Sequence, residues 1–214
     1  MAHQDEELAA ACTAGFEIEL GTRGIDSLPA ALTRARACRS RVVRLVIDVA
    51  HDQPTVNETI TRLRAPVTAL AESGIRLAIE NHDREPAAAL VEIVETLGSD
   101  AVGVTLDTVN SFGALETPQA VITTLAPYVF SLHVKDFTVR RVASQLGFVI
   151  EGCAVGDGRL DVPWLLEQIR AAGRNPNAII ELWTPPATTL EETIALEAEW
   201  AERSVAYLRR LLPE

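Results

Sequence analysis

Apolar and polar residues follow two different periods along this chain, and these periods divide most of it into short strands and longer helices. Nearly continuous apolar runs, typical of strands buried on both faces, occupy residues 42–48, 75–80, 101–106, 128–134 and 178–182. Residues 16–20 alternate apolar and acidic positions and predict one more strand. Apolar residues that recur at steps of three and four predict helices over residues 5–14, 27–38, 56–73, 86–97, 118–125, 162–172 and 189–212.

This alternation of strands and helices predicts parallel strands joined by helical crossovers. The pattern contains six strand–helix units, whereas a closed (β/α)8 barrel needs eight and typically about 250 residues. We therefore expect an α/β fold of the TIM-barrel type that lacks its first two strands, as a single partial domain over residues 1–214. Residues 137–159 break the rhythm and predict a long structured loop, in which residues 148–150 are the candidate strand.

The charge and composition of the chain exclude some classes of binding partner. The net charge of −11 over 214 residues argues against nucleic acid, because phosphate binding needs a basic surface. No apolar run approaches the roughly 20 residues of a membrane span, and the acidic N-terminus lacks the apolar segment of a signal peptide. Three scattered cysteines without CxxC spacing indicate reduced thiols. We expect a cytoplasmic protein with no membrane partner.

The candidate chemistry lies at the ends of four predicted strands. Glu80, Asp107, His133 and Glu181 each close an apolar run. In a barrel of parallel strands these ends share one face, which is where active sites are built. Carboxylates together with one imidazole suit Mn²⁺, Mg²⁺ or Co²⁺, and Zn²⁺ fits as well. The sequence therefore predicts that these side chains converge on one divalent cation.

Two reactions suit such a site. The metal would polarise a carbonyl and stabilise an enediolate, while Glu80 and Glu181 remove and return a proton, which gives isomerisation or epimerisation of a sugar. Loss of CO2 from a β-oxo acid would form the same kind of enolate, and Lys135 or Arg140 would then hold the carboxylate. Each residue also has a structural interpretation, since a glutamate at a strand end often caps a helix or pairs with a cation.

Further polar residues near the strand ends have two interpretations each. His82 fits a substrate contact or a partner that orients a metal ligand. Asn110 fits a substrate contact or a residue that orders its turn. Lys135 reaches the rim of the site or pairs with Asp136. Trp183 fits core packing or an apolar wall beside a sugar.

At these residues the sequence resembles a known family. The motifs are IENH (79–82), LDTVN (106–110), LHVKDF (132–137), the glycine-rich GDGRLD (156–161) and IIELW (179–183). In this order they resemble the xylose isomerase-like TIM barrels, the sugar phosphate isomerase/epimerase group. The resemblance implies that Glu80, Asp107, His133 and Glu181 bind Mn²⁺, Mg²⁺ or Co²⁺, with the two glutamates as the acid/base pair. The segment from residue 134 to residue 183 is similar to a subset that includes decarboxylases of oxo-sugar acids.

Three functional hypotheses follow from this resemblance and from the residues. The first is a metal-dependent isomerase or epimerase of small sugars, with His82, Asn110, Lys135, Arg140 and Trp183 as substrate contacts. The second is a metal-dependent decarboxylase of an oxo-sugar acid on the same scaffold. The third is a non-catalytic metal- or sugar-binding remnant, because the first strands are missing. An exposed edge between the outer strands would invite association, so we also expect a homo-oligomer, most simply a dimer.

Overall fold

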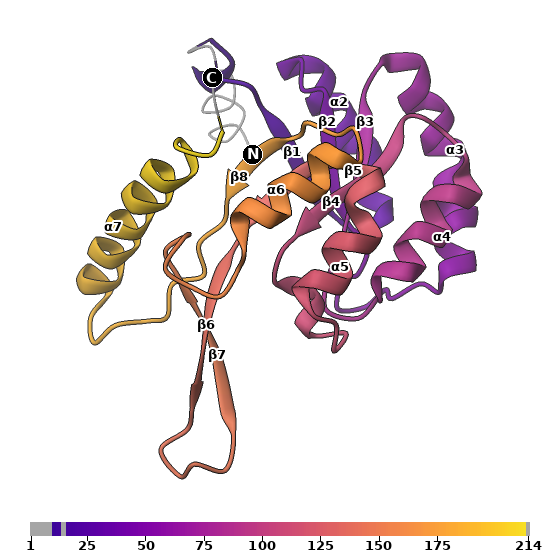
Figure 1. The fold of residues 1–214 in the computed structure, drawn as a ribbon. Coiled ribbons are helices and arrows are strands. Elements are labelled where there is room, and N and C mark those ends of the chain that lie inside the picture. The colour runs from indigo at the N-terminus through magenta and orange to yellow at the C-terminus, as the bar shows by residue number, and fades with distance from the viewer. Residues whose placement is uncertain (1–9, 14–15, 213–214) are drawn as a thin grey trace.

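The computed structural model describes residues 10–13 and 16–212 and contains a six-stranded parallel sheet (Figure 1). Its strands, given in their spatial order, are β1 (Glu19–Arg23), β2 (Val42–Val46), β3 (Arg76–Glu80), β4 (Val102–Asp107), β5 (Val129–Val134) and β8 (Asn177–Ile180). Every neighbouring pair in this sheet is parallel. The expected α/β half-barrel is therefore confirmed.

Five helices provide the crossovers between these strands and lie together on one side of the sheet (Figure 1): α2 (Leu28–Cys38), α3 (Val56–Ser73), α4 (Ala87–Leu97), α5 (Pro118–Leu125) and α6 (Val162–Ala171). The terminal helix α7 (Leu190–Leu208) follows β8 and stands apart from them. The described residues also form the 3-10 turns η1 (Ile25–Ser27), η2 (Asn110–Phe112) and η3 (Ala126–Tyr128). Local sequence fixes their ends. Thr55 and Glu58 form a reciprocal capping box at the start of α3, and Gly74 ends it with φ of 67°.

The core lies between the sheet and the helices that pack on it. Leu45, Leu77, Ile79 and Leu106 point from the strands into this layer and are fully buried. They meet leucine and isoleucine side chains on the inner faces of the helices, such as Leu63 on α3. Because alternate residues of a strand face opposite sides, Ala78 and Glu80 point to the other face, which is the inside of the half-barrel.

The strand register places the predicted ligands on that inner face. Glu80 is level with Thr105, and Asp107 is level with His133. His133 is in turn level with Ile179 on β8, so Glu181 follows on the same side two residues later. The side chains of all four predicted ligands therefore point to the same face of the sheet, at the carboxyl end of the half-barrel.

The two outer strands, β1 and β8, form the edges of the sheet. Their side chains meet near the amino ends of the strands, where Asn177 Nδ2 donates to Glu19 Oε1 at 3.3 Å. No backbone ladder joins them in the part of the chain that the structure describes. The exposed edge expected from the sequence is therefore present, while its association with another copy stays a prediction.

The prediction for residues 16–20 was wrong by three positions. The strand is Glu19–Arg23, and Phe16 lies before it with 71% of its surface exposed. Pairing with β2 decides this, because Glu19 is level with Val42 and Arg23 with Val46. The predicted helix over residues 5–14 lies mostly outside the described residues, although residues 10–13 are helical.

The loop predicted over residues 137–159 is largely a β-hairpin. Strands β6 (Asp136–Arg141) and β7 (Phe148–Cys153) pair antiparallel, from Asp136 opposite Cys153 to Arg141 opposite Phe148. The hairpin projects from the body of the fold (Figure 1), so its outer residues lack a core face and show little apolar alternation. Among the described residues, no helix combines the length and the apolarity needed to cross a membrane.

Candidate metal centre

Glu80, Asp107, His133 and Glu181 lie together at the carboxyl ends of β3, β4, β5 and β8. Each offers one ligand atom, and these atoms all lie within 4.8 Å of one another. Glu80, Asp107 and His133 are buried, with 4%, 1% and 7% of their surface exposed. The side chain of Glu181 is 44% exposed and forms the open side of the cluster. The structure thus brings together the four residues that the sequence pattern singled out.

Glu80 is held by two side chains from neighbouring elements. Asn110 Nδ2 donates to Glu80 Oε1 at 3.0 Å, and Arg44 Nη1 pairs with Glu80 Oε2. Arg44 lies in the middle of β2, where it is the register partner of Ala78 on β3. Its side chain therefore points to the same inner face as Glu80. A buried carboxylate needs such partners, because taking a charge out of water is costly.

Asp107 is fixed by backbone donors on one oxygen and faces a cation with the other. Oδ1 accepts from the amides of Val109 and Asn110, both at 2.9 Å. Oδ2 lies 3.0 Å from Lys135 Nζ, but no hydrogen bond of good geometry reaches this buried atom from the described residues. Burial raises the pKa of Asp107, while Lys135 and the two amides act in the opposite direction. An under-satisfied buried carboxylate oxygen is suited to a metal ion.

His133 and Glu181 form the tightest pair in the cluster. His133 Nδ1 lies 2.8 Å from Glu181 Oε2 and 4.0 Å from Glu80 Oε1. The hydrogen bond with His133 lowers the pKa of Glu181 to about 2, and the charge of Lys135 adds to this effect. Glu181 is therefore ionised at neutral pH, as a metal ligand or a proton acceptor must be.

The ammonium group of Lys135 pairs with acids of the cluster and not with Asp136. Its Nζ lies 3.0 Å from Asp107 Oδ2, 3.5 Å from Glu181 Oε2 and 3.1 Å from Asn110 Oδ1. Burial acts to lower the pKa of Lys135, but Asp107 and the two glutamates outweigh it and raise the pKa. Thr108 fixes the backbone of Lys135 from both sides, since its Oγ1 accepts from Lys135 N at 2.9 Å and donates to Lys135 O at 2.7 Å. The ammonium is thus held at the cluster.

Asp136 organises the glycine-rich loop, a role that the sequence analysis missed. Its two oxygens accept from four backbone amides: Phe137 at 2.7 Å, Gly156 at 2.9 Å, and Gly158 and Leu160 at 3.0 Å. The residue is 1% exposed. A side chain at position 158 would overlap the Asp136 carboxylate, which explains the glycine there. The GDG signal in the sequence marks this cradle.

Trp183 ties the end of β8 to the base of the hairpin. Its Nε1 donates to the carbonyl of Asp136 at 3.0 Å, and its ring packs over Gly152. Trp183 therefore supports the backbone next to Lys135. Its predicted contact with a substrate stays a prediction.

Two predicted substrate contacts are directed away from the cluster. Arg140 lies four residues along β6 from the base of the hairpin and makes a two-point ion pair with Glu151. His82 follows Glu80 but turns its Nδ1 toward Asp83, at 3.3 Å from Oδ2. Strand alternation does not continue beyond the end of β3, so the turn decides where His82 points.

Two residues that support the cluster, Arg44 and Asn81, were not among the residues predicted from the sequence. Asn81 is fully buried and bridges the ends of β3 and β4, because its Oδ1 accepts from Asp107 N at 2.7 Å and its Nδ2 donates to Asp107 O at 2.8 Å. An arginine in the middle of an otherwise apolar strand was the signal for Arg44. Its partner is 36 residues away in the sequence, so local pattern could not identify it.

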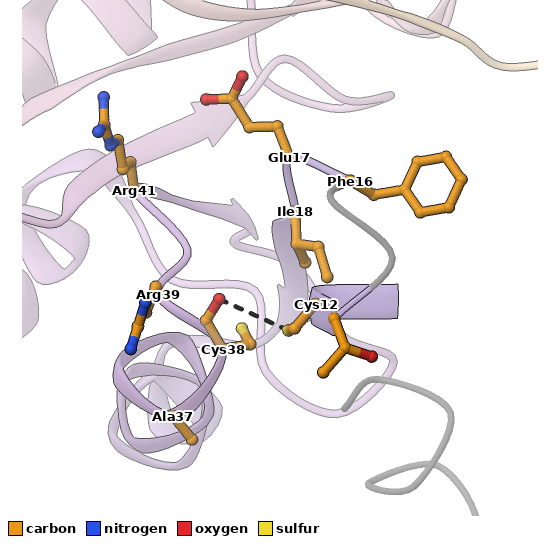
Figure 2. Close-up of a pocket in the computed structure, with 9 residues that line it drawn as sticks. Cys12, Phe16, Glu17, Ile18, Ala37, Cys38, Arg39 and Arg41 are labelled. Carbon is orange, nitrogen blue, oxygen red and sulfur yellow. Dashed lines mark hydrogen bonds between the residues drawn. The ribbon is translucent and has the colours of Figure 1, made fainter. Parts of the chain in front are cut away.

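A separate cavity of about 570 Å³ lies at the opposite, amino ends of β1 and β2 (Figure 2). Cys12, Cys38, Arg39 and Arg41 are among its lining residues, and Cys12 Sγ donates to the carbonyl of Cys38 at 3.5 Å. None of the four clustered ligands lines it. The chemistry of the strand ends, rather than the size of this cavity, therefore identifies the candidate site.

The donor set fits a divalent ion. Three carboxylates and one imidazole provide hard oxygen ligands and one nitrogen, which suit Mg²⁺, Mn²⁺, Co²⁺ and Zn²⁺. The under-satisfied Oδ2 of Asp107 is a second observation that favours a metal ion at this place. Asn81, Asn110 and Thr108 hold the ligands and their neighbours from behind, as outer residues do in metal sites.

Comparison with known proteins gives consistent results. The sequence pattern of a family described as "Xylose isomerase-like TIM barrel" matches residues 11–211. The 3-oxo-isoapionate decarboxylase of Pectobacterium atrosepticum is 37% identical over 196 residues, which cover 91% of this chain and 71% of that protein.

Two solved structures show the same fold at low sequence identity. A D-psicose 3-epimerase crystallised with D-fructose has a TM-score of 0.71 and 17% identity, over 98% of this chain and 85% of the epimerase. A xylose isomerase-like TIM barrel protein from Mycobacterium smegmatis, in complex with magnesium, has a TM-score of 0.66 and 13% identity, over 96% of this chain and 78% of that one. At such identities the likeness concerns the fold.

Proposed function

This chain belongs to the xylose isomerase-like TIM-barrel family, and we propose that it is a divalent-metal-dependent enzyme that decarboxylates a small oxo-sugar acid. The observation that carries the proposal is the set of four ligand atoms within 4.8 Å, with the ammonium of Lys135 fixed against two of the acids. The 37% identity to a 3-oxo-isoapionate decarboxylase favours this reaction over the others on the same scaffold. The relative's own substrate is not thereby assigned to this chain.

In this proposal Glu80, Asp107, His133 and Glu181 hold the metal. When bound, the metal supplies a Lewis acid for a carbonyl oxygen of the substrate. The bond between the carboxylate carbon and its neighbour breaks, CO2 leaves, and the electron pair moves toward that carbonyl. A proton then adds to the carbon. Lys135 is held as a cation beside the site, so in this proposal it stabilises negative charge and donates this proton.

The rest of the site orients these groups. Asn110 links Glu80 to Lys135, because its Nδ2 donates to Glu80 Oε1 while its Oδ1 accepts from Lys135 Nζ. Asn81 locks β3 to β4 directly behind Asp107. Such rigid support matters because catalysis requires groups placed to within a fraction of an ångström.

The decisive experiment compares reactions on one protein preparation. The chain is loaded separately with Mn²⁺, Mg²⁺, Co²⁺ and Zn²⁺ and incubated with a panel of 3-oxo sugar acids, and CO2 release is measured. We expect metal-dependent CO2 release that EDTA abolishes. Unchanged CO2 release after chelation, or no release with any acid of the panel under any metal, would contradict the proposal.

Isomerisation or epimerisation of a neutral sugar is the second candidate. The position of Glu181 favours it, because an ionised carboxylate on the open side of the cluster can accept a proton from carbon. Glu80 would act from the other side of the site. Uptake of solvent deuterium into ketoses by the metal-loaded protein, and its loss in Glu181→Gln, would support this reaction. Binding of metal and sugar without turnover would instead support the non-catalytic remnant.

A further inference from the structure

Three cations in this structure are candidates for holding the carboxylate of an acidic substrate, and their existing contacts separate them. An ammonium group has three N–H donors, and Lys135 already faces three acceptors: Asp107 Oδ2, Glu181 Oε2 and Asn110 Oδ1. A substrate carboxylate at Lys135 would therefore compete with two acids and an amide of the protein itself. Arg140 directs two of its nitrogens at Glu151 on the projecting hairpin.

Arg44 differs from both in its unused donors. A guanidinium group has five N–H donors in a fixed fork, and the recorded contact of Arg44 among the described residues is with Glu80 Oε2. The side chain is 27% exposed, and it reaches an open cavity of about 870 Å³ whose other walls come from β1, η1 and α2 and not from the four clustered ligands.

The neighbouring strand leaves room for the guanidinium. Gly21 on β1 is level with Arg44, and a Cβ at Gly21 would lie 2.5 Å from Arg44 Nη2. Any larger residue there would push the guanidinium aside. The glycine thus keeps the fork inside the half-barrel.

The charges of the cluster indicate what this fork would bind. Glu80, Asp107 and Glu181 carry three negative charges, and Arg44 and Lys135 carry two positive ones. A divalent ion at the cluster would leave a net charge of about +1 when His133 is neutral. A neutral sugar would leave that charge uncompensated in a partly buried site, whereas a monoanionic acid would balance it.

We propose that Arg44 binds the carboxylate of the substrate and thereby makes the site selective for sugar acids over neutral sugars. This inference rests on the proposed function and adds the residue that sets its substrate class. The guanidinium group would then bind Glu80 with one set of its N–H donors and the substrate carboxylate with the others. Because Arg44 would hold the carboxylate before the C–C bond breaks, it would contribute to substrate binding more than to the chemical step.

The test uses two matched probes that do not react. These are 3,4-dihydroxybutanoate, which carries a vicinal diol and a carboxylate, and butane-1,2-diol, which lacks the carboxylate. Their binding to the Mn²⁺-loaded protein is measured by calorimetry, with the Mn²⁺ affinity of each variant measured first. We expect the wild-type protein to bind the acid more tightly by about tenfold or more, the scale of one charge-assisted hydrogen bond.

Four variants at three positions test the role of Arg44, and Arg140→Met tests the rival cation. Arg44→Met should reduce the acid preference to about twofold, and Arg44→Lys should give an intermediate value because one point charge replaces the fork. Gly21→Ala should also weaken the preference while keeping the charge, which keeps the test valid should Arg44→Met fold poorly. Arg76→Met is the matched control, since Arg76 stands on the inner face of β3 at its other end, and it should leave the preference intact.

Two results would overturn the inference alone. One is an undiminished acid preference in both Arg44→Met and Gly21→Ala, and the other is its loss in Arg140→Met instead. Both leave a Mn²⁺-binding protein, so the proposed function would survive them. Failure of the wild-type protein to bind Mn²⁺ would overturn the proposed function and this inference together. In the decarboxylation assay, Arg44→Met should raise KM by tenfold or more with kcat changed by less than about threefold.

Discussion

His133 Nδ1 and Glu181 Oε2 lie 2.8 Å apart, although 48 residues separate them in the chain. The contact crosses from β5 to β8, two strands that the intervening hairpin and α6 separate in sequence and that the sheet makes neighbours. It joins the single imidazole of the cluster to its most exposed carboxylate. The candidate metal centre therefore forms only when β8 pairs with β5.

Replacing His133 should remove the nitrogen ligand from the cluster. We expect His133→Ala to weaken Mn²⁺ binding by about 100-fold or more, since even residues that only support a ligand contribute about 10- to 100-fold. Calorimetric titration with Mn²⁺ measures the loss. His51→Ala, which removes an exposed histidine outside the cluster, is the control. Equal Mn²⁺ affinity in His133→Ala and the wild type would refute the metal centre.

The low pKa of Glu181 should appear as a pH-dependent contribution to stability in the metal-free protein. The pKa in the folded state is about 2, below the value of 4.5 expected when the chain unfolds. The ionised carboxylate therefore stabilises the fold above about pH 4.5, and this contribution is lost as the pH falls toward 2.

The free energy of unfolding in urea is measured for the wild type and for Glu181→Gln at several pH values. The wild type should be the more stable protein at pH 7, and its advantage should shrink between about pH 5 and pH 3. Since the side chain of Glu181 is 44% exposed, solvent screening keeps the effect modest. Glu202→Gln, an exposed position on α7, should show no such trend. A difference that stays constant over this pH range would contradict the assigned pKa.

Removing the Asp136 carboxylate should loosen the glycine-rich loop. Asp136→Ala would leave four backbone amides without their acceptor, and we expect a loss of about 2–4 kcal/mol of stability. Hydrogen exchange should accelerate at Gly156, Gly158 and Leu160. The control is Asp157→Ala in the same loop, whose side chain is 45% exposed and pairs with Arg203, so its cost should stay below about 1 kcal/mol. Equal exchange in both variants would argue against the cradle.

Cys153 should be nearly unreactive in the folded protein. Burial raises the pKa of its thiol to about 12, and the residue is 9% exposed at the base of the hairpin. At pH 8 the thiolate, which is the reactive form, is then scarce. Mass spectrometry after iodoacetamide treatment should show alkylation of Cys153 at least about tenfold slower in the native protein than in urea. Alkylation at equal rates would indicate that the hairpin base opens readily.

The sequence predicted most strands and helices because their residues carry clear local periods. Five of the six sheet strands and the helices between them appear within a few residues of their expected positions. The errors fall where local period is weak. At β1 the pairing with β2 set the limits, and at the hairpin β6–β7 the absence of a core face removed the alternation that would have revealed the strands.

The sequence by itself determined which acids and which imidazole would meet, because parallel strands carry their last residues to one face of a barrel. Tertiary structure alone decided the partners of these ligands. Arg44 reaches Glu80, Lys135 reaches Asp107, and Asp136 turns away to cradle the glycine-rich loop. The physical reason is register: the stagger between strands sets which side chains stand level, and it follows from long-range pairing that no local pattern encodes.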